Sequence, residues 1–216
     1  MDGWYPVMLN ISGRLCVIIG GGSVAERKTA GLLGAGARVR VVSPALAPGL
    51  QELARQGRIE WRRKEADPAD LDGALLVFAA TDDPALNRNL TEMAKAQGML
   101  VNDAVQGNAG NFIVPAVLRR GDFVIAASSS GSSPALAARV IRELGVRYGP
   151  EYAEYAAALR SIREAVKMRV SDPEERRQLL LAAAEEAALE EWLNIGQPDP
   201  ERTVEWLRDR ARNRHS

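Results

Sequence analysis

The stretch "CVIIGGGSVAERK", residues 16–28, places four apolar residues directly before three glycines and then continues as a helical pattern. Gly20, Gly22 and Ala25 fit the G-x-G-x-x-G/A spacing. In that spacing the first glycine allows a tight turn, the second leaves room for a pyrophosphate, and the third small residue lets helix and strand pack closely. The stretch predicts a dinucleotide-binding turn; the alternative interpretation is a tight strand-to-helix turn without a ligand.

Short apolar runs alternate with amphipathic stretches through the first half of the chain. We expect strands over residues 14–20, 38–43, 58–63, 75–80 and 99–102, and helices over residues 23–36, 46–56 and 83–98. Single helices between strands imply parallel pairing with right-handed crossovers. The pattern therefore predicts an α/β fold with a Rossmann-like, doubly wound parallel sheet.

The end of the second expected strand reads Ser43-Pro44. An NAD site usually carries an acidic residue there, about 20 positions after the glycines, to hold the ribose hydroxyls. A serine hydroxyl and backbone groups can also bond to the ribose. No arginine stands at that corner in the sequence, although Arg38 and Arg40 are near. We therefore expect NAD as the cofactor.

The charge balance and the apolar runs limit the classes of partner. Twenty-eight basic and 28 acidic residues cancel, so no overall field favours nucleic acid or an anionic membrane. The apolar runs, such as residues 74–81, are far shorter than the roughly 20 residues that a membrane span needs. The first residues lack a secretory-signal pattern. We expect neither a nucleic-acid nor a membrane partner.

The chain has one cysteine and one histidine. Cys16 lies in a strand-like run and is expected to be a buried thiol in a reducing, cytoplasmic setting. His215 is next to the last residue, so histidine catalysis or ligation of a resident metal has little to build on. Any chemistry must use other groups, and no metal site is expected.

The second half changes character. The segments "FIVPA" at 112–116 and "FVIAAS" at 123–128 are expected to be strands, the latter leading to a serine-rich loop. Ser132 or Ser133 is expected to cap a helix that begins at Pro134, and the clustered hydroxyls equally allow an anion site. Three further helices are expected near 149–169, 173–191 and 200–212.

Four blocks in the same order resemble a known family: "GGGSVAERKTAGLL", "VFAATDD" at 77–83, "NFIVPA" at 111–116 and "SSSGSSPALAARVIREL" at 128–144. They are similar to the dehydrogenase/chelatase module of siroheme synthase, including precorrin-2 dehydrogenases. The resemblance covers about residues 1–150 strongly. It implies a homodimer that oxidises precorrin-2, a tetrapyrrole, to sirohydrochlorin with NAD. In some members ferrous iron, or cobalt, is then inserted, and this ferrochelatase (lyase) activity is left open here.

The same resemblance implies three parts. These are an NAD-binding Rossmann domain over residues 1–113, a dimerisation segment over 114–147, and a helical C-terminal domain over 148–216. Residues at matching positions would contact the cofactor. Gly22, Ser23 and Val24 would take the pyrophosphate, Ser43 and Pro44 the adenosine ribose, and Ala80 and Thr81 the strand end that faces the nicotinamide. Gly20, Ala25 and Asn102 complete the expected cofactor-binding set. Thr81 equally fits a hydrogen-bonding role at a strand end.

The chain departs from the family at the catalytic acid. Members carry an aspartate three residues after an asparagine, and that position is Val105 here. Asp103, directly after Asn102, is the nearest acid and the candidate catalytic residue. The alternative is that Asp103 only turns the loop. Metal insertion must remove two pyrrole protons, whereas hydride transfer depends mainly on the cofactor, so dehydrogenation is favoured over chelation.

A tetrapyrrole with several carboxylates calls for cations around an apolar cleft. Arg119 and Arg139 are the candidates, with Arg120 and Arg142 beside them, although Arg139 and Arg142 also fit an exposed helix face. In the family a serine of the serine-rich loop lines the substrate pocket and can be phosphorylated, which implies Ser129, with Ser128 adjacent. Two other hypotheses stay open: a nucleotide-sensing regulatory domain, and a dimer that binds a porphyrinoid without turnover.

Overall fold

The computed structural model describes residues 3–107, 109–195 and 199–213. His215 lies outside the described residues. The chain divides into two compact units, described separately below. The first comprises the chain up to Val114 together with Ser130–Ser133, and the second comprises Pro115–Ser129 and the chain from Pro134 onward. The predicted three-part division is finer than these two units and stays a prediction.

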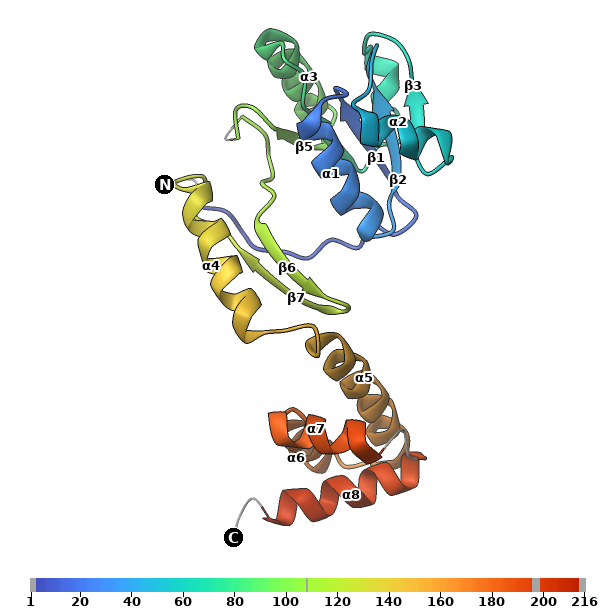
Figure 1. The fold of residues 1–216 in the computed structure, drawn as a ribbon, viewed down its shortest axis with the longest axis vertical. Coiled ribbons are helices and arrows are strands. Elements are labelled where there is room, and N and C mark those ends of the chain that lie inside the picture. Colours follow the sequence, from blue (N-terminus) through green and yellow to red (C-terminus); the bar gives the residue numbers. More distant parts are fainter. Residues whose placement is uncertain (1–2, 108, 196–198, 214–216) are drawn as a thin grey trace. The chain divides into compact units, whose positions relative to one another are not determined.

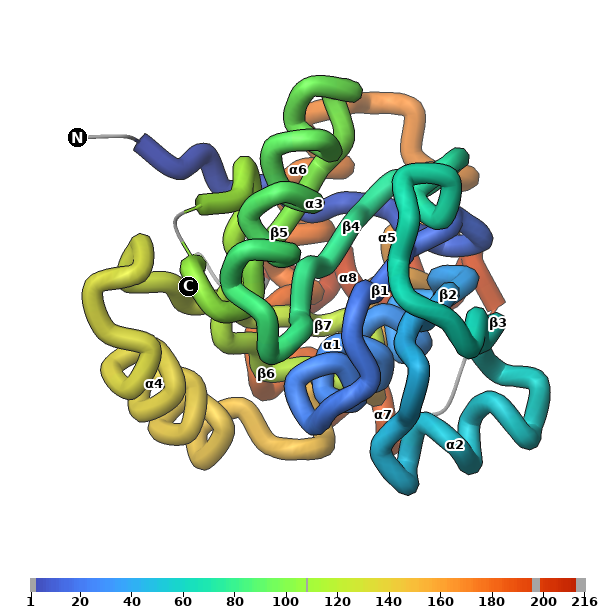
Figure 2. Tube along the Cα trace, turned by 90° about the horizontal axis from the view of Figure 1, so that it is seen from above, coloured from blue at the N-terminus to red at the C-terminus, as the bar shows by residue number. Residues whose placement is uncertain are grey.

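The first unit contains a five-stranded parallel sheet. Its strands are β1 (Leu15–Ile19), β2 (Arg38–Val42), β3 (Glu60–Arg62), β4 (Leu76–Ala79) and β5 (Leu100–Asp103). Their spatial order is β3-β2-β1-β4-β5. Figure 2 shows the five labelled strands in this order from right to left. The order reverses between β1 and β4, and open α/β sheets bind ligands at such a point. The predicted doubly wound fold is confirmed.

Helices cover both faces of this sheet (Figure 1). They are α1 (Ser23–Gly34), α2 (Pro48–Arg55), the short 3-10 helix η1 (Pro68–Leu71) and α3 (Pro84–Ala96). Ile18, Phe78 and Leu50 lie in the core beneath α1 and α2, and Val77 and Leu90 lie in the core beneath η1 and α3. Because both faces are buried, the central strands read as continuous apolar runs.

A charged cluster ties β2 and β3 to η1. The Asp70 carboxylate is fully buried and accepts from Arg62 Nη1 at 2.8 Å and from the Asp67 N–H at 3.0 Å, and Lys64 Nζ lies 3.0 Å from it. Arg40 Nη1 donates to the Asp70 carbonyl oxygen at 3.0 Å, and Arg40 Nε pairs with Glu60 at 2.9 Å. The sequence did not predict this cluster, since its members come from three separate elements.

The second unit begins with an antiparallel pair, β6 (Ala116–Arg120) and β7 (Phe123–Ala127), followed by α4 (Pro134–Arg147). The prediction of a strand over 112–116 is wrong, because β6 begins only at Ala116. The segment before it serves the first unit instead: the Phe112 ring packs edge-on against Phe78, and Pro115 has no N–H to offer a strand ladder.

The described part of the second unit continues with the helices α5 (Tyr152–Arg169), α6 (Pro173–Ala183), α7 (Glu186–Ile195) and α8 (Pro200–Asn213). The single helix predicted over 173–191 is wrong, because α6 ends at Ala183 and α7 starts at Glu186. The break turns the chain so that Leu189 and Trp192 join the core formed with Leu207. Burial of these side chains outweighs the helix propensity of the alanine-rich sequence between the two helices.

Each helix among the described residues is too short or too polar to cross a membrane.

Cys16 offers a direct check on the packing of β1. Its side chain is fully buried in the sheet, and burial raises the pKa of the thiol to about 11. The thiolate is the reactive form, so the folded protein is expected to resist a thiol reagent at pH ~8, while the urea-unfolded chain reacts with one equivalent. Equal labelling rates for the folded and unfolded chain would contradict this burial.

Candidate functional site

The turn between β1 and α1 brings the backbone of three loops together. Gly20 has φ +119°, and a Cβ there would lie 2.2 Å from the Ala80 carbonyl oxygen. A Cβ on Gly21 would lie 1.9 Å from the Ala45 carbonyl oxygen. A Cβ on Gly22 would meet no atom of the described residues within 4 Å. The first two glycines therefore let neighbouring loops approach, and the third leaves open space in front of the helix.

Helix α1 begins directly at this open space. Gly22 is its N-cap, and no side chain of the described chain caps the helix. The first intrahelical bond runs from the Glu26 N–H to the Gly22 carbonyl oxygen at 3.0 Å, so the N–H groups of Ser23, Val24 and Ala25 have no acceptor within the helix. These donors, with the positive end of the helix dipole, suit a phosphate group. The buried Ala25 faces the sheet.

The Ser43-Pro44 corner is bonded to the glycine turn. The Ala47 N–H donates to the Gly21 carbonyl oxygen at 2.7 Å, and the Gly20 N–H donates to the Val42 carbonyl oxygen at 2.9 Å. A Cβ on Gly21 would also lie 2.8 Å from Ser43 Oγ. The predicted ribose and pyrophosphate positions are therefore adjacent. Gly21 was missed by sequence reasoning because the G-x-G spacing leaves its position free.

Thr81, just beyond β4, is held by Asn87. Thr81 Oγ1 donates to Asn87 Oδ1 at 2.7 Å, the Thr81 N–H reaches the same oxygen at 3.1 Å, and Asn87 Nδ2 donates back to the Thr81 carbonyl oxygen at 3.0 Å. Asn87 is fully buried in α3. The hydroxyl of Thr81 is thus engaged in fixing the loop, which fits the strand-end alternative. Its contact with a nicotinamide stays a prediction.

Asn102 and Asp103 end β5 beside β4, in register with Phe78 and Ala79. Asn102 Nδ2 donates to the Phe112 carbonyl oxygen at 3.1 Å, while Asn102 Oδ1 is buried without a partner among the described residues. Asp103 is 1% exposed, and its Oδ1 accepts from the N–H groups of Val105 at 2.8 Å and Gln106 at 2.7 Å. Asp103 therefore does turn the loop, and its catalytic role stays a prediction.

Val105, at the position where the resemblance would place an acid, is 59% exposed. A hydrocarbon side chain there can neither take nor give a proton.

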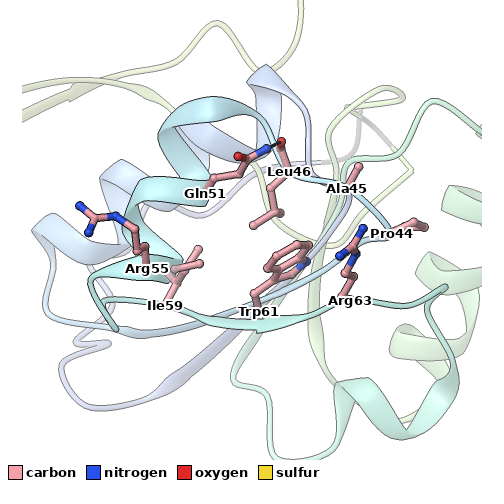
Figure 3. A pocket seen from close by; sticks show the side chains of 9 residues that line it. Pro44, Ala45, Leu46, Gln51, Arg55, Ile59, Trp61 and Arg63 are labelled. Carbon is pink, nitrogen blue, oxygen red and sulfur yellow. Dashed lines mark hydrogen bonds between the residues drawn. The ribbon is translucent and has the colours of Figure 1, made fainter.

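A cavity of about 710 Å³ lies beside the Ser43-Pro44 corner, between α2 and β3 (Figure 3). It is lined by Pro44, Ala45, Leu46, Gln51, Ala54, Arg55, Ile59, Trp61 and Arg63. Trp61 Nε1 donates to the Ser43 carbonyl oxygen at 3.0 Å, and the Arg63 guanidinium lies over the Trp61 ring, 5.6 Å from its centroid. The expectation that no arginine stands at this corner is wrong, because Arg63, which directly follows β3, lines the same cavity as Pro44.

The two arginines that the sequence suggested lie elsewhere. Arg38 begins β2, at the strand end opposite Ser43, and Arg40 is buried in its pairs with Glu60 and Asp70. Gly22 leaves open space, and neither the first N–H groups of α1 nor Asn102 Oδ1 has a side-chain partner among the described residues. This room and these polar groups fit a bound dinucleotide.

Comparison with known proteins agrees with this geometry. A family model described as "Putative NAD(P)-binding" matches residues 7–116, just over half of the chain. The chain belongs to this NAD(P)-binding family. The matched residues run from before β1 to the start of β6 and so include the glycine turn, the Ser43-Pro44 corner and the ends of β4 and β5.

This member of the NAD(P)-binding family is also similar to part of two longer proteins. It is 39% identical over 175 residues to the siroheme synthase of Chromobacterium violaceum, covering 81% of this chain and 37% of that protein. It is 40% identical over 176 residues to the siroheme synthase of Thioalkalivibrio sulfidiphilus, covering 81% of this chain and 36% of that protein. The chain thus spans little more than a third of the length of these curated relatives.

A solved structure, that of SirC, a precorrin-2 dehydrogenase, matches with a TM-score of 0.75 and 26% sequence identity. The match covers 95% of this chain and 100% of that chain.

The candidate substrate residues lie in the second unit. Arg119 is exposed on β6, and Arg139 is exposed on α4, where its Nε lies 3.5 Å from Glu143. Arg120 instead donates to the carbonyl oxygens of Tyr148 and Gly145, which ties β6 to the end of α4. Ser128 and Ser129 directly follow β7. The substrate roles of Arg119, Arg139, Ser128 and Ser129 stay predictions.

Proposed function

We propose that this chain binds NAD⁺ and uses it to oxidise precorrin-2 to sirohydrochlorin in siroheme biosynthesis. The observation that carries the proposal is the match to SirC, a precorrin-2 dehydrogenase, over 95% of this chain, in which Gly22 leaves open space in front of α1. The siroheme synthase relatives support the same reaction.

The oxidation removes two electrons and two protons from the tetrapyrrole. NAD⁺, when bound, accepts one hydrogen with its electron pair as a hydride. The other hydrogen leaves as a proton, and Asp103 is the group that we propose receives it. Oδ1 of Asp103 is occupied by the N–H groups of Val105 and Gln106, so Oδ2 is the oxygen left for this role.

The experiment is anaerobic incubation of the full chain with precorrin-2 and NAD⁺, followed by the absorbance of sirohydrochlorin. Growth of that absorbance together with NADH is expected. A chain that binds NAD⁺ without turnover would support the nucleotide-sensing alternative, and a chain that binds tetrapyrrole alone would support the non-catalytic dimer. Either result would end the dehydrogenase proposal.

The role of Asp103 is tested by Asp103→Asn. An amide oxygen still accepts the two loop N–H bonds but cannot take a proton, so we expect normal thermal stability and a rate about a hundredfold lower. Asp82→Ala is the matched control, because Asp82 is exposed in the neighbouring loop after β4. Dehydrogenation that persists at the parental rate in Asp103→Asn would remove the proposed acid.

Three finer features belong to the same proposal. We propose a homodimer, supported by the exposed apolar side chains of Val117 on β6 and Leu136 on α4, which sedimentation would test.

A free, buried Cys16 fits a reducing compartment, so we place the enzyme in the cytoplasm. Ferrous or cobalt ion added after oxidation tests ferrochelatase activity, in which the metal is a substrate. The exposed hydrocarbon at Val105 disfavours that second reaction.

A further inference from the structure

Lys28 is a cation that the protein leaves without a carboxylate partner. It is half-buried in the second turn of α1, and among the described residues its ammonium group makes no ion pair. Lys95, which is also half-buried, pairs with Glu92 at 3.4 Å. Burial lowers the pKa of Lys28, and the like charge of Arg27 lowers it further. A half-buried ammonium group without a counter-ion is unfavourable, and an anionic ligand would relieve this cost.

The ammonium group of Lys28 lies near the edge of the sheet at which such folds bind ligands. Side chains of a helix lean toward its N-terminus, and α1 begins at the carboxyl end of β1. Accordingly, Lys28 Nζ lies over the Phe78 ring, 5.5 Å from its centroid, and Phe78 is the last residue but one of β4. The charge is therefore held beside the end of β4, over an aromatic face.

An acceptor without a partner lies on the same face of the sheet. Asn102 is in register with Phe78 on the adjacent strand, and paired residues of parallel strands direct their side chains to one face. Asn102 is 5% exposed, and its Oδ1 has no hydrogen-bond partner among the described residues. The Phe112 ring packs edge-on against Phe78 and adds apolar surface. A ligand at this place would meet a cation, an acceptor and aromatic carbon.

The anion at Lys28 can come from the cofactor or from the substrate. The N–H groups of Ser23, Val24 and Ala25 are available to the pyrophosphate at the helix start, whereas Lys28 lies further along α1 and reaches β4. Outside its pyrophosphate, NAD⁺ carries no anionic group. A tetrapyrrole carries several carboxylates, and an ammonium group with three donors suits one of them.

We propose that Lys28 binds a carboxylate of the tetrapyrrole substrate beside the ends of β4 and β5. The inference rests on the proposed function, since it takes precorrin-2 as the substrate. It makes Lys28 a substrate-binding residue of the first unit, in addition to the candidates Arg119 and Arg139 of the second. The ion pair is remote from the hydrogens that are removed, so it holds the substrate equally in the ground state and in the transition state.

The test measures tetrapyrrole and cofactor binding separately, on the full chain and without oxygen. Sirohydrochlorin, the product, is titrated by absorbance without NAD⁺, and NAD⁺ is titrated by calorimetry without tetrapyrrole. Lys28→Met is expected to weaken sirohydrochlorin about tenfold, the low end of the range for a hydrogen bond to a charged group. Its NAD⁺ affinity should change less than about twofold. In turnover, the KM for precorrin-2 should rise about tenfold while kcat stays within about threefold.

Two further variants separate charge from packing. Lys28→Arg keeps the positive charge and should bind sirohydrochlorin within about threefold of the parent. Lys95→Met is the matched control, because Lys95 is a half-buried lysine of the first unit that is already paired with Glu92. It should bind both ligands as the parent does.

The outcomes distinguish this inference from the proposed function. Parental sirohydrochlorin affinity in Lys28→Met would mean that the stem of Lys28 only covers Phe78. An equal loss of NAD⁺ affinity would place a cofactor phosphate at Lys28. Either result would overturn the inference and leave the proposed function intact. A parental chain that binds sirohydrochlorin but does not oxidise precorrin-2 would end the proposed function, and the Lys28 variants would still decide the carboxylate contact. A parental chain that binds no tetrapyrrole would overturn both.

Discussion

Gly22→Val is expected to weaken NAD⁺ binding about a hundredfold or more while leaving the protein folded, a loss of roughly 3 kcal/mol in binding free energy. The reason is the open space at this position, where an added Cβ meets no described atom within 4 Å. Gly22 has φ −84°, which valine adopts readily, so the folded chain tolerates the change. The added methyl groups fill the room through which a pyrophosphate must reach the donors of α1.

Calorimetric titration with NAD⁺ measures this loss, and a thermal melt checks the fold. Gly31→Val is the matched control, since Gly31 is an exposed residue of the same helix with open space around it. It should bind NAD⁺ normally. Unchanged affinity in Gly22→Val would mean that the dinucleotide does not pass this turn. Gly20→Val is uninformative as a binding test, because its Cβ would collide with Ala80 and disturb the fold.

Asp70→Ala is expected to lower the free energy of unfolding of the first unit by about 3 kcal/mol, the range for breaking a buried ion pair. Asp70 is the buried centre that accepts from Arg62 and the Asp67 N–H and pairs with Lys64. Its loss leaves these donors without their shared acceptor and frees η1 from β3. Urea unfolding followed by circular dichroism measures the change. The control Asp72→Ala, at an exposed neighbouring position, should stay within about 0.5 kcal/mol of the parent.

The same cluster predicts a pH dependence. Burial alone would raise the pKa of Asp70, but the hydrogen bonds from Asp67, Arg62 and Lys64 outweigh it and hold the pKa below its usual value. A carboxyl with a depressed pKa stabilises the fold above its unfolded pKa and loses this contribution as the pH falls through the folded pKa. The stability difference between the parent and Asp70→Asn should therefore be largest near pH 7 and shrink below about pH 4. A difference that is constant over this range would contradict the ionised state of Asp70.

The sheet was predictable because its signals are local. Residues 16–19 and 76–79 are continuous apolar runs. Asp83 followed by Pro84 is typical of a helix start, and in the structure the Asp83 carboxylate accepts from the N–H groups of Ala85 and Leu86 at the start of α3. The wrong elements have tertiary causes. The strand expected over 112–116 is displaced because Phe112 packs on Phe78. The long helix expected over 173–191 breaks because Trp192 must turn into the helical core.

The site was predictable only where one short motif builds it. Gly20, Gly22 and Ala25 stand out by spacing, whereas Asn87 and Arg63 reach the same edge of the sheet from later elements. No spacing rule links Ser43 to Arg63, since the parallel pairing of β2 with β3 brings them together. The sequence position of Asp103 allows it either to turn the loop or to act as an acid. In the structure the N–H groups of Val105 and Gln106 both bond to Oδ1, so the loop turn uses only one of the two carboxylate oxygens.

The hydrogen bonds between Asn87 and Thr81 affect the entropy cost of binding a ligand at this edge of the sheet. Three hydrogen bonds immobilise the connection between β4 and α3 before anything arrives, so that rim of the sheet has already lost its conformational entropy during folding. Association then carries little penalty for organising the rim, and more of the contact energy remains as affinity. A molecule of the wrong shape also gains no accommodation from this rigid wall, so discrimination there is steric.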